Sequence, residues 1–198
     1  MIRKLYLMKL AMNKLKSVST FVVLCVLLFA ISLASVSNAQ QKPDGSHDFD
    51  WEIGSWKTHL KRLVRPLTGS TTWVEHDGTT VVTKVWNGKA NLVELDVTGP
   101  SGHIEALSIR LYNPDARQWS LNYSNSATGT MTAPVFGEFK NGRGEFFGVD
   151  TANNRTVLVK FIITCANKDA CHFEQFFSDD SGKTWELNWI ADDTRVKN

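Results

Sequence analysis

Hydrophobic and polar residues alternate along most of the chain after residue 54, which is typical of half-buried β-strands. Trp56 and Leu60 share one face of such a run, and Trp119, Leu121 and Tyr123 share one face of another. Gly, Asn, Asp and Pro cluster between the runs, and no internal helix is expected. Strands are predicted over residues 56–61, 70–76, 79–86, 91–97, 103–112, 118–124, 135–140, 145–150, 157–164, 172–178 and 185–191.

The connections between these strands are short. Asp77 with Gly78 and Asn87 with Gly88 form dipeptides that favour two-residue hairpin turns. Short, even spacing predicts an all-β fold of about ten strands. Hairpin connections favour an up-and-down meander over a Greek key, and closing the sheet removes its two bare edges. We therefore predict one closed, up-and-down antiparallel β-barrel.

The final hairpin carries a recognisable turn pattern. Ser178, Asp180, Gly182, Thr184 and Trp185 match the Asp-box, a hairpin motif found in many secreted β proteins. Asp180 can bond the backbone two residues on, and Gly182 can supply a positive φ. Trp185 can fold back over the turn. The motif indicates a hairpin and does not indicate a function.

The first 39 residues differ from the rest of the chain. Basic residues without any acidic one precede an apolar run at residues 21–34, and Ser37 and Ala39 place small residues at a cleavage site. This order predicts a secretory signal peptide over residues 1–39, since a membrane span needs about 20 apolar residues. We expect a periplasmic or secreted protein with no stable membrane anchor, a loose leader at residues 40–46 and a barrel domain at residues 47–198.

Removal of the leader changes the sign of the net charge. The whole chain has 22 Lys and Arg against 20 Asp and Glu. Five of the basic residues and none of the acidic ones lie in residues 1–39, so 17 basic and 20 acidic residues remain, a net charge of −3. A mildly acidic domain lacks the electrostatic footprint of a nucleic-acid-binding protein.

Two cysteines remain after the leader, Cys165 and Cys171, each beside a predicted strand. An even pair at this spacing in an exported protein predicts a disulfide that closes the base of a hairpin loop. So short a ring stabilises the fold by only about 2 kcal/mol on the loop-entropy model. Free catalytic thiols are the alternative.

Gly54, Ser55 and Trp56 resemble the G-x-W signature of lipocalins and the wider calycin group. The resemblance implies that Trp56 closes one end of a barrel beneath a basic residue from a late strand, for which Arg195 is the candidate. The chain resembles more closely an uncharacterised family of exported bacterial calycin-like proteins, a domain of unknown function. The matching segments are residues 47–50, 110–114, 117–120, 142–146, 173–175 and the Asp-box hairpin through Trp189. This resemblance implies the fold and no settled activity.

The sequence has no nucleophile elbow, no phosphate-binding loop and no dinucleotide-binding motif. The five histidines, His47, His59, His76, His103 and His172, are scattered without metal-ligand spacing. We therefore expect no cofactor, no metal and no recognisable catalytic residues.

Aromatic content suggests where a ligand could bind. A barrel of about eight or more strands can enclose a ligand cavity, and alternation places apolar and aromatic side chains inside this one. Tyr123 and Gln175 are the expected polar groups, because a buried hydroxyl or amide needs a partner. The predicted ligand-binding residues are Trp73, Trp119, Tyr123, Gln175 and Trp189. Other expected inward positions are Val93, Leu95, Leu107, Ile109, Leu121, Val159, Phe161, Phe173, Phe177 and Leu187.

Two functions of different classes follow. The first is a non-catalytic barrel that binds a small, largely apolar molecule. The alternative is a small barrel enzyme, such as a cyclase, isomerase or lyase, that uses a buried carboxylate as general base. That alternative requires the opposite strand faces to point inward, with Arg110, Glu174 and Asn188 near Glu94 or Asp96. An interaction module with exposed aromatic residues is a third class.

Overall fold

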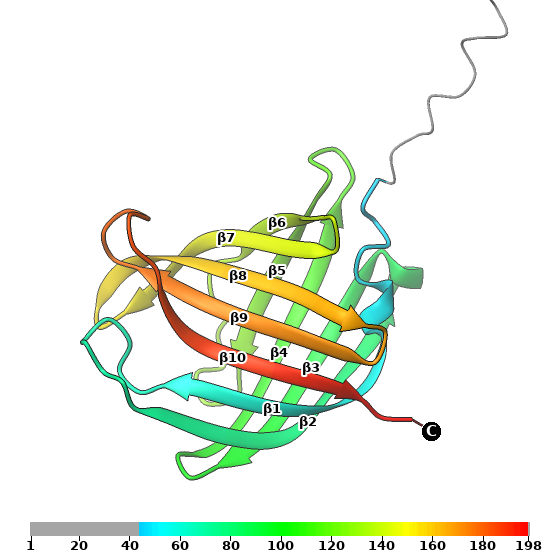
Figure 1. Cartoon of the computed structure of the whole chain (residues 1–198). Helices are drawn as coiled ribbons and strands as arrows, with labels where there is room; N and C mark the ends of the chain where they lie inside the picture. The colour runs from blue at the N-terminus through cyan, green and yellow to red at the C-terminus, as the bar shows by residue number, and fades with distance from the viewer. Residues whose placement is uncertain (1–43, 198) are drawn as a thin grey trace, which may run out of the picture. The chain divides into compact units, whose positions relative to one another are not determined.

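The computed structural model describes residues 44–197 and is a closed antiparallel barrel of ten strands (Figure 1). Each strand pairs with its sequence neighbours, and the barrel closes between the first and last strands. The strands are β1 (Gly54–Leu63), β2 (Trp73–Val85), β3 (Ala90–Gly99), β4 (Gly102–Asn113), β5 (Gln118–Asn125), β6 (Val135–Lys140), β7 (Arg143–Ala152), β8 (Arg155–Asn167), β9 (Ala170–Ser178) and β10 (Glu186–Arg195). The predicted fold class and up-and-down topology are confirmed.

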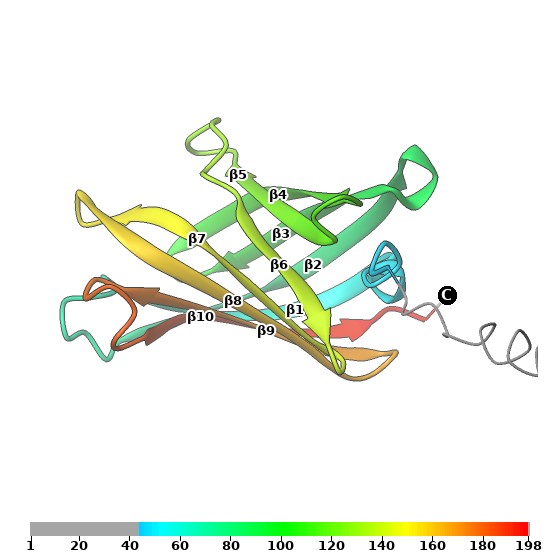
Figure 2. The same cartoon turned by 90° about the horizontal axis from the view of Figure 1, so that it is seen from above.

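The predicted signal peptide and residues 40–43 of the predicted leader lie outside the described residues. Two short 3₁₀ helices, η1 (Asp50–Glu52) and η2 (Trp86–Gly88), accompany the strands. No helix within residues 44–197 has the length and apolar character needed to cross a membrane. Figure 2 shows from above how the strands wrap round the interior.

The segment ahead of β1 fills one end of the barrel. Phe49 is buried there, and its ring lies edge-on to Trp119 and Phe139 at centroid distances of 5.0 Å. The Trp119 indole nitrogen donates a hydrogen bond of 2.8 Å to the Gly45 carbonyl. Phe49 therefore belongs to the packed core at this end, and the segment around it is held against the barrel.

Arg195 closes the barrel over Trp56, as the lipocalin resemblance implied. Its guanidinium carbon lies 4.0 Å from the centre of the Trp56 ring. The same guanidinium donates hydrogen bonds to the carbonyls of Ile53 (2.9 Å) and Trp51. Glycine suits position 54 beneath it, because the backbone φ is +129° and an added Cβ would lie 2.9 Å from the Arg195 Nη1 atom.

The turn expected at Asp77 and Gly78 is wrong. Both residues lie inside β2, where Gly78 pairs with Thr58 of β1 and Val97 of β3. A Cβ on Gly78 would lie 2.0 Å from the backbone oxygen of Asp96. Glycine is needed here for close approach of two strands in a curved sheet and not for a turn, so two predicted strands are one.

A β-bulge in β10 corrects another expectation. Leu187 pairs with Phe176 of β9, whereas Trp189 pairs with Gln175. Paired residues share a face and neighbours along a strand point to opposite faces, so Leu187 and Trp189 do not both point inward. The bulge leaves Asn188 buried between them.

Cys165 and Cys171 form a disulfide, as predicted. They are paired residues at the end of the β8–β9 hairpin, where the register shifts by a bulge. The bridge therefore clamps the base of that loop.

The Asp-box turn forms between β9 and β10. Asp180 accepts hydrogen bonds from the Ser178 hydroxyl (2.8 Å) and from the backbone and hydroxyl of Thr184 (3.0 and 2.7 Å). Gly182 has a φ of +84°, and the Trp185 indole donates to its carbonyl. The bond from Asp180 thus reaches the backbone four residues on, where two were expected.

Candidate functional site

A cavity of about 460 Å³ lies inside the barrel. Its wall comes from η1 and from strands on all sides of the barrel, so no single sequence segment contains it. Aliphatic and aromatic side chains form most of the wall, including Leu60, Val93, Leu95, Leu121, Phe161, Ile163, Phe173 and Trp189. A cavity with this lining can hold a small, largely apolar molecule.

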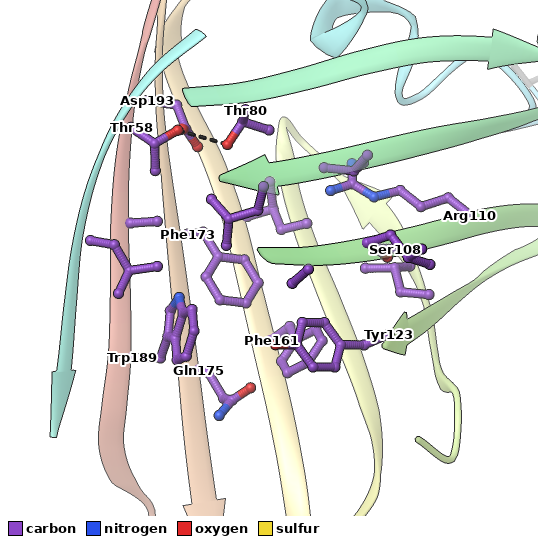
Figure 3. Close-up of a pocket in the computed structure, with 18 of the residues that line it drawn as sticks. Thr58, Thr80, Ser108, Arg110, Tyr123, Phe161, Phe173, Gln175, Trp189 and Asp193 are labelled. Atoms are coloured by element: carbon purple, nitrogen blue, oxygen red, sulfur yellow. Dashed lines mark hydrogen bonds between the residues drawn. The ribbon is translucent and has the colours of Figure 1, made fainter. Parts of the chain in front are cut away.

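Three of the five predicted ligand-binding residues line this cavity, namely Tyr123, Gln175 and Trp189 (Figure 3). Burial raises the pKa of the Tyr123 hydroxyl, so it is a neutral donor and acceptor at physiological pH. The Gln175 amide nitrogen donates to the Asn188 side-chain oxygen at 2.8 Å. Gln175 is therefore already held by a protein partner.

The other two predicted residues lie away from the cavity wall. Trp119 points into the barrel, but at the end that Phe49 fills, and only 2% of its surface is exposed. Trp73 begins β2 opposite Leu63 and is partly exposed. The alternation of β5 predicted the direction of Trp119 and could not show that residues 44–52 occupy the space in front of it.

A chain of hydrogen bonds joins three polar residues at one side of the cavity (Figure 3). The Thr58 hydroxyl donates to the Asp193 carboxylate at 2.5 Å and lies 2.7 Å from the Thr80 hydroxyl. Burial raises the pKa of Asp193, while the Thr58 bond and the positive charge of Arg110 oppose that rise. This cluster comes from β10, β1 and β2, which are adjacent through barrel closure.

Arg110 also points into the barrel, and the expected parity of β4 is wrong. Leu107 and Ile109 were expected inside, yet they are 37% and 36% exposed, whereas Arg110 is 7% exposed. Leu107 still borders the cavity, and Ile109 does not. The guanidinium pairs with the Glu52 carboxylate and lies 4.3 Å from the centre of the Phe49 ring. A charged residue is tolerated inside because this partner from η1 compensates it.

The electrostatic state of Arg110 follows from its burial. Removal from water lowers its pKa to about 9, and the nearby Asp193 charge opposes that change. Arg110 is therefore still a cation at neutral pH. Within residues 44–197 its Nε atom is buried without a hydrogen-bond partner.

The acidic residues expected for the enzymatic alternative do not line the cavity. Glu94 and Asp96 are exposed, and Glu174 is half-buried, with its carboxylate 3.5 Å from His172. The carboxylates that line the cavity are Glu52, Asp150 and Asp193. Sequence reasoning missed Asp193, although it shares a strand face with Trp189, Ala191 and Arg195, and that parity could have placed it inside.

One group of side chains in the described part of the chain has spacing suited to a metal ion. Asp96, His103 and Glu105 place their ligand atoms within 4.8 Å of one another on exposed faces of β3 and β4. The His103 ring lies 2.8 Å from the Asp96 carboxylate, and this hydrogen bond raises the pKa of His103. An ordinary surface ion pair accounts for this arrangement.

Comparison with known proteins gives a likeness in fold. No family model and no curated protein matches this chain. Among solved structures, the S-type phycobiliprotein lyase CPES from Guillardia theta superposes with a TM-score of 0.53 at 14% identity, covering 81% of this chain and 99% of the lyase. This likeness supports the fold, a closed antiparallel β-barrel.

Two further solved structures are similar at lower scores. The protein EF1p2_mFAP2b bound to DFHBI has a TM-score of 0.42 at 9% identity, covering 77% of this chain and 99% of that one. A Nostoc punctiforme protein of unknown function from the DUF3598 family has a TM-score of 0.21 at 8% identity, with the same coverage.

Proposed function

We propose that this protein is an exported, calycin-like barrel that binds a small, largely apolar molecule in its interior. The observation that carries the proposal is the cavity of about 460 Å³ with aromatic walls. A cavity of this size and lining can take up most of the surface of a small ligand. Phe161, Phe173 and Trp189 would contact the body of that ligand, and Tyr123 offers a polar group beside it.

Export is part of this proposal. The apolar leader at residues 1–39 and a disulfide between Cys165 and Cys171 are both typical of proteins outside the cytosol. Fractionation of cells that express the full chain, followed by intact-mass measurement, tests it. We expect a periplasmic or secreted product that begins at Gln40. A full-length product retained in the cytosol would contradict export.

Titration with the uncharged probe N-phenyl-1-naphthylamine tests binding. We expect saturable fluorescence enhancement with one probe per barrel. Ala106→Trp should abolish it, because Ala106 lines the cavity and the larger side chain would fill it. Ile109→Trp is the matched control on the outer face of the same strand and should leave binding intact. Equal loss in both variants, or none in either, would contradict an internal site.

The enzymatic alternative has one observation in its favour. Asp193 lies in the cavity with a raised pKa, as a general acid or base requires. Mass spectrometry of the molecule that co-purifies with the protein, before and after prolonged incubation, separates the two functions. Chemical conversion that Asp193→Asn stops, with binding retained, would establish turnover. An unchanged molecule supports binding alone.

A further inference from the structure

We propose that the ligand is amphipathic and carries a protonated amine, which sits at Asp193 while its apolar body lies among the aromatic rings. This inference rests on the proposed function and names the class of molecule. It comes from the hydrogen-bond direction and the charge balance at one side of the cavity, and from the aromatic wall beside it.

The Asp193 cluster presents acceptors to the cavity. The Thr58 hydroxyl has one hydrogen, and it uses this hydrogen toward Asp193. The Thr80 hydroxyl, 2.7 Å away, must then donate to Thr58. Both hydroxyl hydrogens are thus used within the cluster, and the carboxylate keeps lone pairs on its second oxygen. A ligand group that satisfies this cluster has to donate hydrogen bonds.

The charges at this side of the cavity are unbalanced. Arg110 is one cation, and its Nη1 pairs with Glu52 while its guanidinium lies over the face of Phe49; within residues 44–197 its Nε has no hydrogen-bond partner. Glu52 and Asp193 are two carboxylates. One negative charge therefore remains when Asp193 is ionised, and a bound ammonium group would neutralise it in a region with little water.

Neighbouring ionisable groups do not supply that positive charge. Around Tyr123, the positive charge of Arg62 lowers the tyrosine pKa and the negative charge of Asp150 raises it. Asp150 lines the cavity, whereas Arg62 does not. His172 is among the residues that line the cavity, but its two ring nitrogens face other carboxylates, Asp192 at 2.7 Å and Glu174 at 3.5 Å.

The aromatic wall suits both parts of such a ligand. Phe161 and Phe173 pack edge-to-face with centroids 5.1 Å apart, and Trp189 lines the same cavity (Figure 3). These rings contact an apolar body, and ring faces also attract an ammonium group. Figure 3 shows Phe173 between the Asp193 cluster and the group of Tyr123 and Phe161.

Three ligands with one apolar body test the inference by calorimetry at pH 7: 2-(1-naphthyl)ethylamine, 2-(1-naphthyl)ethanol and 1-naphthylacetate. We expect the amine to bind about tenfold more tightly than the alcohol, the gain of one charge-assisted hydrogen bond, and the carboxylate to bind most weakly. Equal affinities, or tightest binding of the carboxylate, would overturn the amine inference and leave apolar binding standing. If none of the three binds, the proposed function itself fails.

Two variants at adjacent positions test whether the preference for the amine depends on Asp193. Asp193→Asn keeps the shape and an acceptor but removes the charge, and it should lower the amine affinity about tenfold, to that of the alcohol. The affinity ratio of amine to alcohol should fall to about one, and an unchanged circular dichroism spectrum shows that the variant is folded. Asp192→Asn removes an exposed neighbour and should leave the preference for the amine intact. Loss of the preference in Asp192→Asn, or its retention in Asp193→Asn, contradicts the assignment.

Discussion

Asp180 and Asp193 lie 13 positions apart in one hairpin, yet their surroundings are opposite. Asp180 accepts three hydrogen bonds from its own turn, which hold the pKa of its carboxyl well below the ordinary value. Asp193 accepts one, from Thr58, and burial raises its pKa. The Asp180 carboxylate accepts its hydrogen bonds from its own turn and so stabilises the fold. The Asp193 carboxylate has few protein donors and can still accept hydrogen bonds from a ligand.

The largest expected effect tests whether the charged side of the cavity also supports the fold. Arg110→Met leaves Glu52 and Asp193 without their cation, and we expect a loss of about 3–5 kcal/mol in the free energy of unfolding, as for other broken buried pairs. The Arg110 and Glu52 side chains are only 9% and 13% exposed. Urea denaturation followed by circular dichroism measures the loss.

Two controls accompany Arg110→Met. Arg143→Met removes the cation of a pair with Glu145 that is about half exposed, and it should cost less than about 1 kcal/mol. Adding Glu52→Gln to Arg110→Met should recover part of the lost stability. Equal losses in Arg110→Met and Arg143→Met would show that Arg110 is not held in a buried pair.

The next effect concerns the turn. Asp180→Ala removes the acceptor of all three turn bonds, and we expect a lower midpoint of urea unfolding, with a smaller loss than in Arg110→Met. Asp179→Ala is the matched control, because its neighbouring carboxylate pairs with Arg155 at the surface. If both variants unfold like wild type, the turn does not depend on Asp180, and the contrast with Asp193 fails.

The pH dependence of stability should have opposite signs at the two residues. The folded pKa of Asp180 lies below its ordinary value of 3.8, so its contribution is full above that value and is lost as pH falls through the folded pKa. The folded pKa of Asp193 is raised, so its contribution is full below 3.8 and is lost as pH rises through the folded pKa. Urea unfolding at a series of pH values measures this. The free energy of unfolding of wild type minus that of Asp180→Ala should increase as pH rises. Wild type minus Asp193→Asn should decrease as pH rises.

The smallest effect is a gain. Asp193→Asn removes a buried charge and keeps an acceptor for Thr58. We expect the free energy of unfolding at pH 7 to stay level or to rise by up to about 1 kcal/mol, the size of one hydrogen bond. A substantial loss of stability would mean that Asp193 serves the fold as Asp180 does.

Local pattern predicted the fold well. The inward face of Trp56 and Leu60, the disulfide and the Asp-box turn each depend on residues close in sequence or on strict alternation. The misplaced turn at Gly78 shows the limit of that reasoning. Its need for glycine comes from Asp96 on a neighbouring strand, so no local signal distinguishes close approach from a turn.

The candidate site was less predictable, because its chemistry depends on contacts between distant strands. Arg110 points inward on account of Glu52, which lies 58 positions earlier. Asp193 meets Thr58 across 135 positions, through the closure of β10 on β1. Alternation assigns a face to each residue, but it cannot show which charge finds a partner inside.

The contact between Arg195 and Trp56 has a consequence for folding kinetics. Strands β1 and β10 are the first and last of the barrel, and such non-local pairing is expected to form late because loop-closure entropy opposes it. Trp56 lies under Arg195 only once that last pairing has formed. During refolding, the emission of this indole should therefore report the late sealing of the barrel, separately from the earlier growth of its hairpins.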